Sequence, residues 1–139
     1  MLLPKKVKHR KWHKNRRNMK TIGVDTRGTT LNFGQFGLKT VSYARITSNQ
    51  IESARKVIAR SVSKTGRIWI RIFPDRPITA KPPEVPMGSG KGDVQGYCME
   101  VKPGRIIFEI DGVTDEIAKE ALRKAGTKLP IKSKIITRI

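Results

Sequence analysis

The chain has 139 residues with 30 Lys and Arg against 11 Asp and Glu, which gives a formal net charge of +19 at pH 7. This length predicts one domain. No apolar run reaches the roughly 18–20 residues of a membrane span, no secretion signal is expected, and a single cysteine excludes an internal disulfide. The sequence therefore predicts a soluble intracellular domain, whose positive field favours nucleic acid or, second, an anionic membrane surface.

The positive charge is concentrated in the first part of the chain. Residues 1–81 hold 20 bases and three acids, whereas residues 82–139 hold ten bases and eight acids. Residues 1–20, the N-terminal arm, carry nine bases and no acid, with His9, Trp12 and His13 interleaved. Such a segment is expected to be disordered when free and to be ordered by a polyanion, because bound phosphates release counterions. We interpret the arm as a segment that binds nucleic acid rather than as a solvated tail or a transit peptide. Transit peptides are rich in Ser, whereas residues 1–20 contain none.

Beyond the arm, residues 23–30 are predicted to form a loop and residues 31–46 to form β-structure. Gly34 and Gly37 indicate a bulge or a close backbone approach. Phe33 and Phe36 are either core residues or a stacking platform, and at least one of them is expected in the core.

A helix is predicted next, with a capping box formed by Thr47 and Gln50 and a C-cap at Gly66. One face is apolar and contains Ile51, Ala54, Ile58 and Val62. The other face is basic and extends the positive surface of the arm, although a charged helix face is often merely solvated; it contains Arg55, Lys56, Arg60 and Lys64.

Residues 67–73 alternate as a strand does, which places Trp69, Arg71 and Phe73 on one face. Arg and aromatic side chains both stack on bases, so this face is predicted to lie against nucleic acid. Residues 74–92 hold five of the eight prolines and end in a Gly-rich run, which predicts a long loop. Its glycines allow the backbone to approach a phosphate, with Lys91 as the point charge.

The remaining residues are predicted to be scaffold. Residues 93–102 and 105–110 are expected to form two strands joined by a turn at residues 103–104, followed by a helix over 114–125 and a strand over 131–136. The order hairpin, helix, strand then occurs twice. The sequence predicts an α+β single domain over 1–139, a sandwich of two helices on one mixed or antiparallel sheet. Residues 1–30 are the RNA-binding arm and loop, and residues 31–139 are the body with its extended loop 74–92.

No catalytic arrangement is evident. Residues 85–92 fail the P-loop pattern, because Val85 stands where a Gly is needed and Gly92 where Ser or Thr is needed. Cys98 is expected to be a small core residue. Glu109 and Asp111 are expected to be exposed carboxylates near a turn. Neither a cofactor nor a metal site is predicted, and the chain is not expected to be an enzyme.

Several segments, in this order, resemble the family of large-subunit ribosomal protein sixteen in its bacterial and organellar form. They are residues 1–6 (MLLPKK), 33–39 (FGQFGLK), 46–52 (ITSNQIE), 66–75 (GRIWIRIFPD), 77–82 (PITAKP), 87–92 (MGSGKG) and 128–132 (KLPIK). Pro86 departs from the family, since many bacterial members have an Arg there that can be hydroxylated. Neither that cation nor its modification is expected in this chain.

The resemblance implies a structural protein of the large ribosomal subunit that binds ribosomal RNA, helps to shape the aminoacyl-tRNA site and joins late in assembly. The partners implied are large-subunit ribosomal RNA, aminoacyl- and peptidyl-tRNA and neighbouring large-subunit proteins, in a cytoplasmic or organellar ribosome, without a membrane. The residues expected to contact ribosomal RNA are Lys5, Lys6, Lys8, Arg10, Lys11, Trp12, Lys14, Arg16, Arg17, Lys20, Lys39, Arg45, Arg55, Lys56, Arg60, Lys64 and Arg71. The residues expected near tRNA are Lys81, Met87, Gly88, Ser89, Gly90, Lys91 and Gly92.

Two other functions are compatible with the charge. A free-standing RNA-binding regulator or chaperone would have the same basic face but would exchange from the ribosome. A cationic membrane-surface protein would need bulky apolar residues opposite its bases. The helix predicted after residue 47 has only Ile, Val and Ala there, which favours packing on a sheet.

Overall fold

The computed structural model describes residues 1–16, 18 and 20–139. Within these residues the chain forms seven strands and two helices. In chain order they are β1 (Phe36–Thr40), β2 (Ala44–Thr47), α1 (Ser48–Val62), β3 (Arg67–Ile70), β4 (Arg76–Ala80), β5 (Asp93–Val101), β6 (Ile106–Asp111), α2 (Asp115–Gly126) and β7 (Ser133–Thr137). Neither of these helices is long and apolar enough to cross a membrane.

The strands form two antiparallel sheets, ordered β3-β6-β1-β7 and β2-β5-β4. The two sheets are connected by a bent two-stranded ribbon, in which β1 leads into β2 and β5 leads into β6. Lys39 lies opposite Ile106 in the first sheet and Ala44 opposite Val101 in the second, so the register continues unchanged through the bend. At the bend, the Thr40 N–H donates to the Arg105 carbonyl oxygen at 2.9 Å, and the Gly104 N–H donates to the Thr40 carbonyl oxygen at 2.8 Å.

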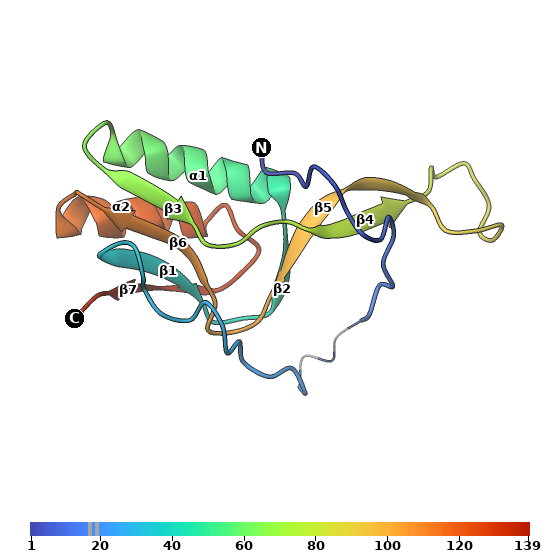
Figure 1. Cartoon of the computed structure of the whole chain (residues 1–139), viewed down its shortest axis with the longest axis horizontal. Helices are drawn as coiled ribbons and strands as arrows, with labels where there is room; N and C mark the ends of the chain where they lie inside the picture. Colours follow the sequence, from blue (N-terminus) through green and yellow to red (C-terminus); the bar gives the residue numbers. More distant parts are fainter. Residues whose placement is uncertain (17, 19) are drawn as a thin grey trace.

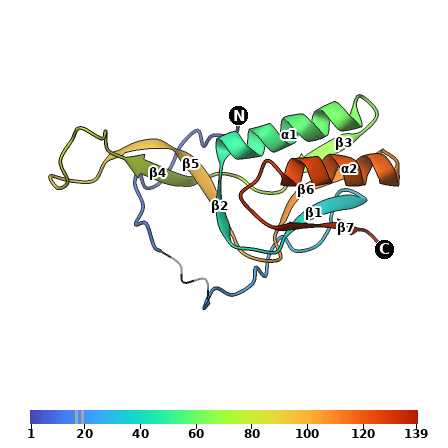
Figure 2. The same cartoon turned by 180° about the vertical axis from the view of Figure 1, so that it is seen from behind.

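Both helices lie side by side on one face of the four-stranded sheet, as Figures 1 and 2 show from opposite sides. The apolar face of α1 is buried as predicted, and its N-cap Thr47 forms the predicted capping box with Gln50. Four residues of α2 face the same core, namely Ala118, Ala121, Leu122 and Ala125. Phe36, Leu38, Phe108 and Ile110 meet them from the sheet, so the core lies between these two layers.

The second sheet extends away from this core. Strands β4 and β5 form a hairpin whose connecting loop, residues 81–92, projects at the end of the molecule farthest from the helices (Figure 1). The first part of the N-terminal arm, within residues 1–16, runs alongside this extension, and the segment from residue 20 to β1 lies beneath the four-stranded sheet (Figure 1).

The α+β class with two helices and antiparallel strands is confirmed, but three local predictions are wrong. The expected hairpins do not exist, since β1 and β2, like β5 and β6, are successive parts of one bent strand. The predicted loop 74–92 contains strand β4, whose Pro77 stands in a strand paired with β5 alone, an edge position that tolerates proline. Helix α1 ends with Ser63 as its C-cap rather than Gly66, which packs instead close to Val62.

Candidate nucleic-acid interface

The arm is attached to the second sheet through its main chain. Arg76, on β4, donates from Nη2 to the carbonyl oxygens of His13 at 2.6 Å and Lys14 at 2.8 Å. Arg45, on β2, donates from Nη2 to the carbonyl oxygen of Asn15 at 3.0 Å and to that of Lys14. These four bonds use carbonyl oxygens of the arm's backbone, so they occupy none of its basic side chains.

A carboxylate on the central strand of this sheet offsets the positive charge of the two arginines. Glu100, on β5, lies 3.6 Å from Arg45 Nε and 3.6 Å from Arg76 Nη1. Arg76 is 8% exposed, and its guanidinium lies 5.4 Å from the centre of the Trp12 ring. The contact holds Trp12 against the sheet while 38% of that residue stays exposed, which suits a ring that stacks on a base.

The loop 81–92 contacts the arm. Lys91 donates from Nζ to the Trp12 carbonyl oxygen, and Lys11 donates from Nζ to the Lys91 carbonyl oxygen at 3.2 Å. Within the loop, Lys81 donates to the Gly88 carbonyl oxygen. The arm and the loop are thus joined at the same place, around an open cavity of about 520 Å³. Its lining combines ammonium, imidazole and indole groups from His9, Lys11, Trp12, His13, Asn15 and Lys91.

The tip of this loop has a backbone that a side chain would strain. Gly88 and Gly90 have φ of 102° and 105°, and Ser89 has φ of 60°. These values lie in the left-handed region, which glycine adopts without a steric penalty. Met87 beside them is 99% exposed.

Helix α1 presents the basic face predicted for it. Lys56, Arg60 and Lys64 are exposed. Arg55 differs, because it makes a bidentate contact with Glu52 at 2.5 and 3.1 Å. The hydrogen bond from Arg55 lowers the pKa of the Glu52 carboxyl below its usual value and raises that of the guanidinium. Arg55 is therefore already partly neutralised.

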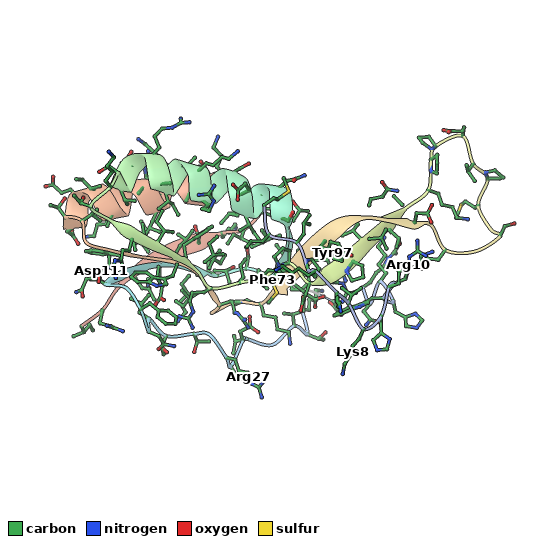
Figure 3. The ribbon with its side chains drawn as sticks, turned by 45° about the horizontal axis from the view of Figure 1, so that its top comes forward. Lys8, Arg10, Arg27, Phe73, Tyr97 and Asp111 are labelled. Carbon is green, nitrogen blue, oxygen red and sulfur yellow. The ribbon has the colours of Figure 1, made fainter. Side chains whose placement is uncertain are left out.

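The predicted RNA-contacting residues fall into two groups. The exposed group lies on the arm and on α1 and contains Lys5, Lys6, Lys8, Arg10, Trp12, Lys14, Arg16, Lys20, Lys56, Arg60 and Lys64. The half-buried group contains Lys11, Lys39, Arg45, Arg55 and Arg71. Arg17 lies outside the described residues. Figure 3 shows Lys8 and Arg10 beside the second sheet, at the opposite end of the molecule from Asp111.

Three groups escaped the sequence analysis. Arg76 binds the arm's backbone and pairs with Glu100. Arg76 lies within the proline-rich stretch 74–92, which has no periodicity from which its burial could be predicted. The prediction for Glu109 is wrong, because its side chain is fully buried. It accepts the Asn32 N–H at 2.7 Å and lies 3.2 Å from Arg71 Nη1. Its place within the apolar run of residues 106–110 was the available signal.

The described residues show no catalytic arrangement. Cys98 is buried, as predicted for a small core residue, and burial raises the pKa of its thiol. Within the described residues no three His, Cys, Asp or Glu side chains gather as a metal site requires. A two-layer α+β domain with a cationic arm and helix face is typical of proteins whose positive field attracts polyanions.

Comparison with known proteins gives the particular family. The sequence pattern of the family described as ribosomal protein L16p/L10e matches residues 4–136, so the chain belongs to this family of structural ribosomal constituents, which are not enzymes. Relatives named large ribosomal subunit protein uL16 are 55% identical in Afipia carboxidovorans, 56% in Acidiphilium cryptum and 55% in Caulobacter vibrioides. Each alignment spans 100% of this chain and 98%, 98% and 94% of the respective relative.

Proposed function

We propose that the chain is a structural constituent of the large ribosomal subunit in the bacterial cytoplasm, where it binds ribosomal RNA and contacts tRNA. The observation that carries this proposal is full-length similarity to proteins named large ribosomal subunit protein uL16. The neighbours would be ribosomal RNA and other large-subunit proteins. The role in late subunit assembly follows from the same resemblance.

Ribosomal RNA would be held by the arm and by the basic face of α1. In the arm, carbonyl oxygens of residues 13–15 are bonded to Arg45 and Arg76, while basic side chains such as Lys8 and Arg10 are exposed. Each phosphate that these cations neutralise releases condensed counterions, which favours binding. The arm is thus supported from one side by the sheet and open to RNA on the other.

The loop 81–92 would contact tRNA. The loop projects beyond the second sheet (Figure 1) and its Met87 is exposed, so it is accessible to a bound RNA at a distance from the body. Glycines at 88 and 90 let RNA approach the backbone closely. The contacts of Lys91 in the loop with Lys11 and Trp12 in the arm would fix the direction of the loop relative to RNA already bound there.

Sucrose-gradient fractionation of a native lysate at moderate and high salt tests the proposal. We expect the protein to migrate with the large subunit at both salt concentrations. Migration in the light fractions at moderate salt would contradict a subunit constituent and would favour the free-standing regulator. Because the gradient measures residence and not contact, crosslinking of the intact subunit then identifies the RNA that lies against the arm and the loop.

A further inference from the structure

Phe33 exposes an aromatic ring on the face of the four-stranded sheet that the helices leave open. Ile68 and Ile70 of β3 pack against the core beneath the helices. Successive side chains of a strand point to opposite faces, so Trp69 lies on the open face, opposite Glu109 of β6. The Phe33 ring stacks against Trp69 with centroids 6.0 Å apart and an interplanar angle of 19°.

The segment before and after Phe33 is fixed at each residue. The buried Glu109 carboxylate accepts the Asn32 N–H at 2.7 Å and the Phe33 N–H at 3.3 Å. The Gln35 N–H donates to the Ile110 carbonyl oxygen at 3.0 Å. A Cβ on Gly34 would lie 2.6 Å from that same oxygen. Only a glycine permits this approach, so the backbone that carries the ring is held in one place.

Two arginines bond to the chain segment that precedes the ring, and they have different charge environments. Arg71 lies with Cζ 5.3 Å from the Phe33 ring centre, donates to the Thr30 carbonyl oxygen at 3.1 Å and is paired with Glu109 at 3.2 Å. Arg138 is exposed and donates one hydrogen bond, to the Leu31 carbonyl oxygen at 3.0 Å. A guanidinium has several further N–H donors that match a phosphate. Arg138 is therefore the cation available to a ligand.

The Phe33 ring is 54% exposed, so it offers an aromatic surface to a ligand beside Trp69 and Arg71. Unpaired bases stack on aromatic rings and on guanidinium planes, and they do so with little sequence preference. We propose that Phe33, Trp69 and Arg71, here named the Phe33 platform, bind one unpaired base of RNA, while Arg138 contacts the adjoining phosphate. The inference rests on the proposed function only in that its ligand is RNA.

The test compares a short single-stranded oligoadenylate with a blunt RNA duplex of equal length, each titrated into the full chain. Phe33→Ala should weaken single-strand binding by roughly 5- to 100-fold, the range that stacking on one aromatic gives. Duplex binding and the salt dependence of both affinities should stay as in wild type, because no charge is removed. Phe33→Tyr should restore single-strand binding.

Matched variants separate stacking from folding. Ile117→Ala truncates an exposed apolar side chain on α2, 44% exposed, and should leave single-strand affinity unchanged. Phe33→Leu keeps apolar packing on Trp69 and should melt like wild type, yet bind single strands as weakly as Phe33→Ala. Arg138→Gln should lower the magnitude of the slope of log affinity against log salt by about 0.7 for the single strand, since one phosphate contact is lost.

The outcomes distinguish the platform from the proposed function. Wild-type chain that binds both RNAs, with Phe33→Ala or Phe33→Leu unaltered, overturns the platform and leaves the proposed function intact. Equal weakening of single-strand and duplex binding also overturns the platform. Wild-type chain that binds neither RNA overturns the proposed function, and the platform with it.

Discussion

Replacing Glu109 with Gln tests how the open face of the sheet is held together. The Glu109 carboxylate is fully buried and meets three donors, the Asn32 N–H, the Phe33 N–H and the Arg71 guanidinium. Gln has the same shape but no charge, and its amide group turns one acceptor into a donor. The substitution therefore leaves Arg71, whose side chain is only 14% exposed, without its counter-charge and sets two N–H groups against a weaker acceptor.

The magnitude follows from burial. Removing one partner of a buried ion pair costs about 3–5 kcal/mol, because the other charge stays desolvated. Arg71 keeps its bond to the Thr30 carbonyl oxygen and some exposure, which places Glu109→Gln at the lower end, about 3 kcal/mol. For a domain of this size such a loss lowers the melting temperature by roughly 10 °C.

Thermal and urea unfolding, followed by circular dichroism and tryptophan fluorescence, measure this loss. Glu120→Gln is the matched control: its carboxylate is 50% exposed and pairs with Arg123 at 2.8 Å, so its unfolding midpoint should stay near that of wild type. A double-mutant cycle with Arg71→Met should show coupling of about 1–3 kcal/mol. A Glu109→Gln midpoint equal to that of Glu120→Gln, or zero coupling, would refute the reasoning.

Four further predictions follow from the same structure. Gly34→Ala should destabilise the fold by about 1–3 kcal/mol through its contact with the Ile110 carbonyl oxygen, whereas Gly96→Ala, with nothing within 4 Å, should melt like wild type; equal melting of the two would contradict the close approach. Deleting residues 1–20 removes nine of 30 bases and should flatten the salt dependence of RNA binding; an unchanged slope would show that the arm does not meet phosphates. Burial of the Cys98 thiol, which raises its pKa, should make it react with a disulfide reagent at mildly alkaline pH only as fast as the chain unfolds, and a rapid burst from native protein would contradict this. Lys91→Ala should leave folding and subunit incorporation intact but weaken tRNA-dependent function; failed incorporation would instead make the loop an assembly element.

The helices were predictable because their signals are local. Thr47 and Gln50 form the capping box that their spacing indicates, and Ile51, Ala54 and Ile58 are buried as their periodicity requires. The predicted C-cap at Gly66 is wrong for the same reason. A glycine after a helix suggests a C-cap, but this one is needed for packing near Val62 and Val113. Its role comes from residues distant in sequence, which a local pattern does not contain.

Strand pairing was predicted less well, because β4 and β5 are the only consecutive strands of the described residues that are neighbours in a sheet. The residues between β5 and β6 were predicted to form a turn, yet Gly104 and Arg105 bond to Thr40 at the end of β1, where the chain also bends. A proline and glycine at 103–104 indicate a change of direction but not whether the chain reverses or continues.

Several arginines of the body are paired with carboxylates, which a count of charges in the sequence does not show. Arg45, Arg55 and Arg71 were predicted as RNA ligands, but each pairs with a carboxylate, of Glu100, Glu52 and Glu109 respectively. Arginine suits such internal pairs, since its planar guanidinium binds carboxylates and backbone oxygens with several donors at once. By contrast, Lys56 and Arg60 of α1 and most bases of the arm are exposed. The number of phosphates neutralised, read from the salt slope, should therefore fall below the number of predicted cations, with the deficit among arginines of the body.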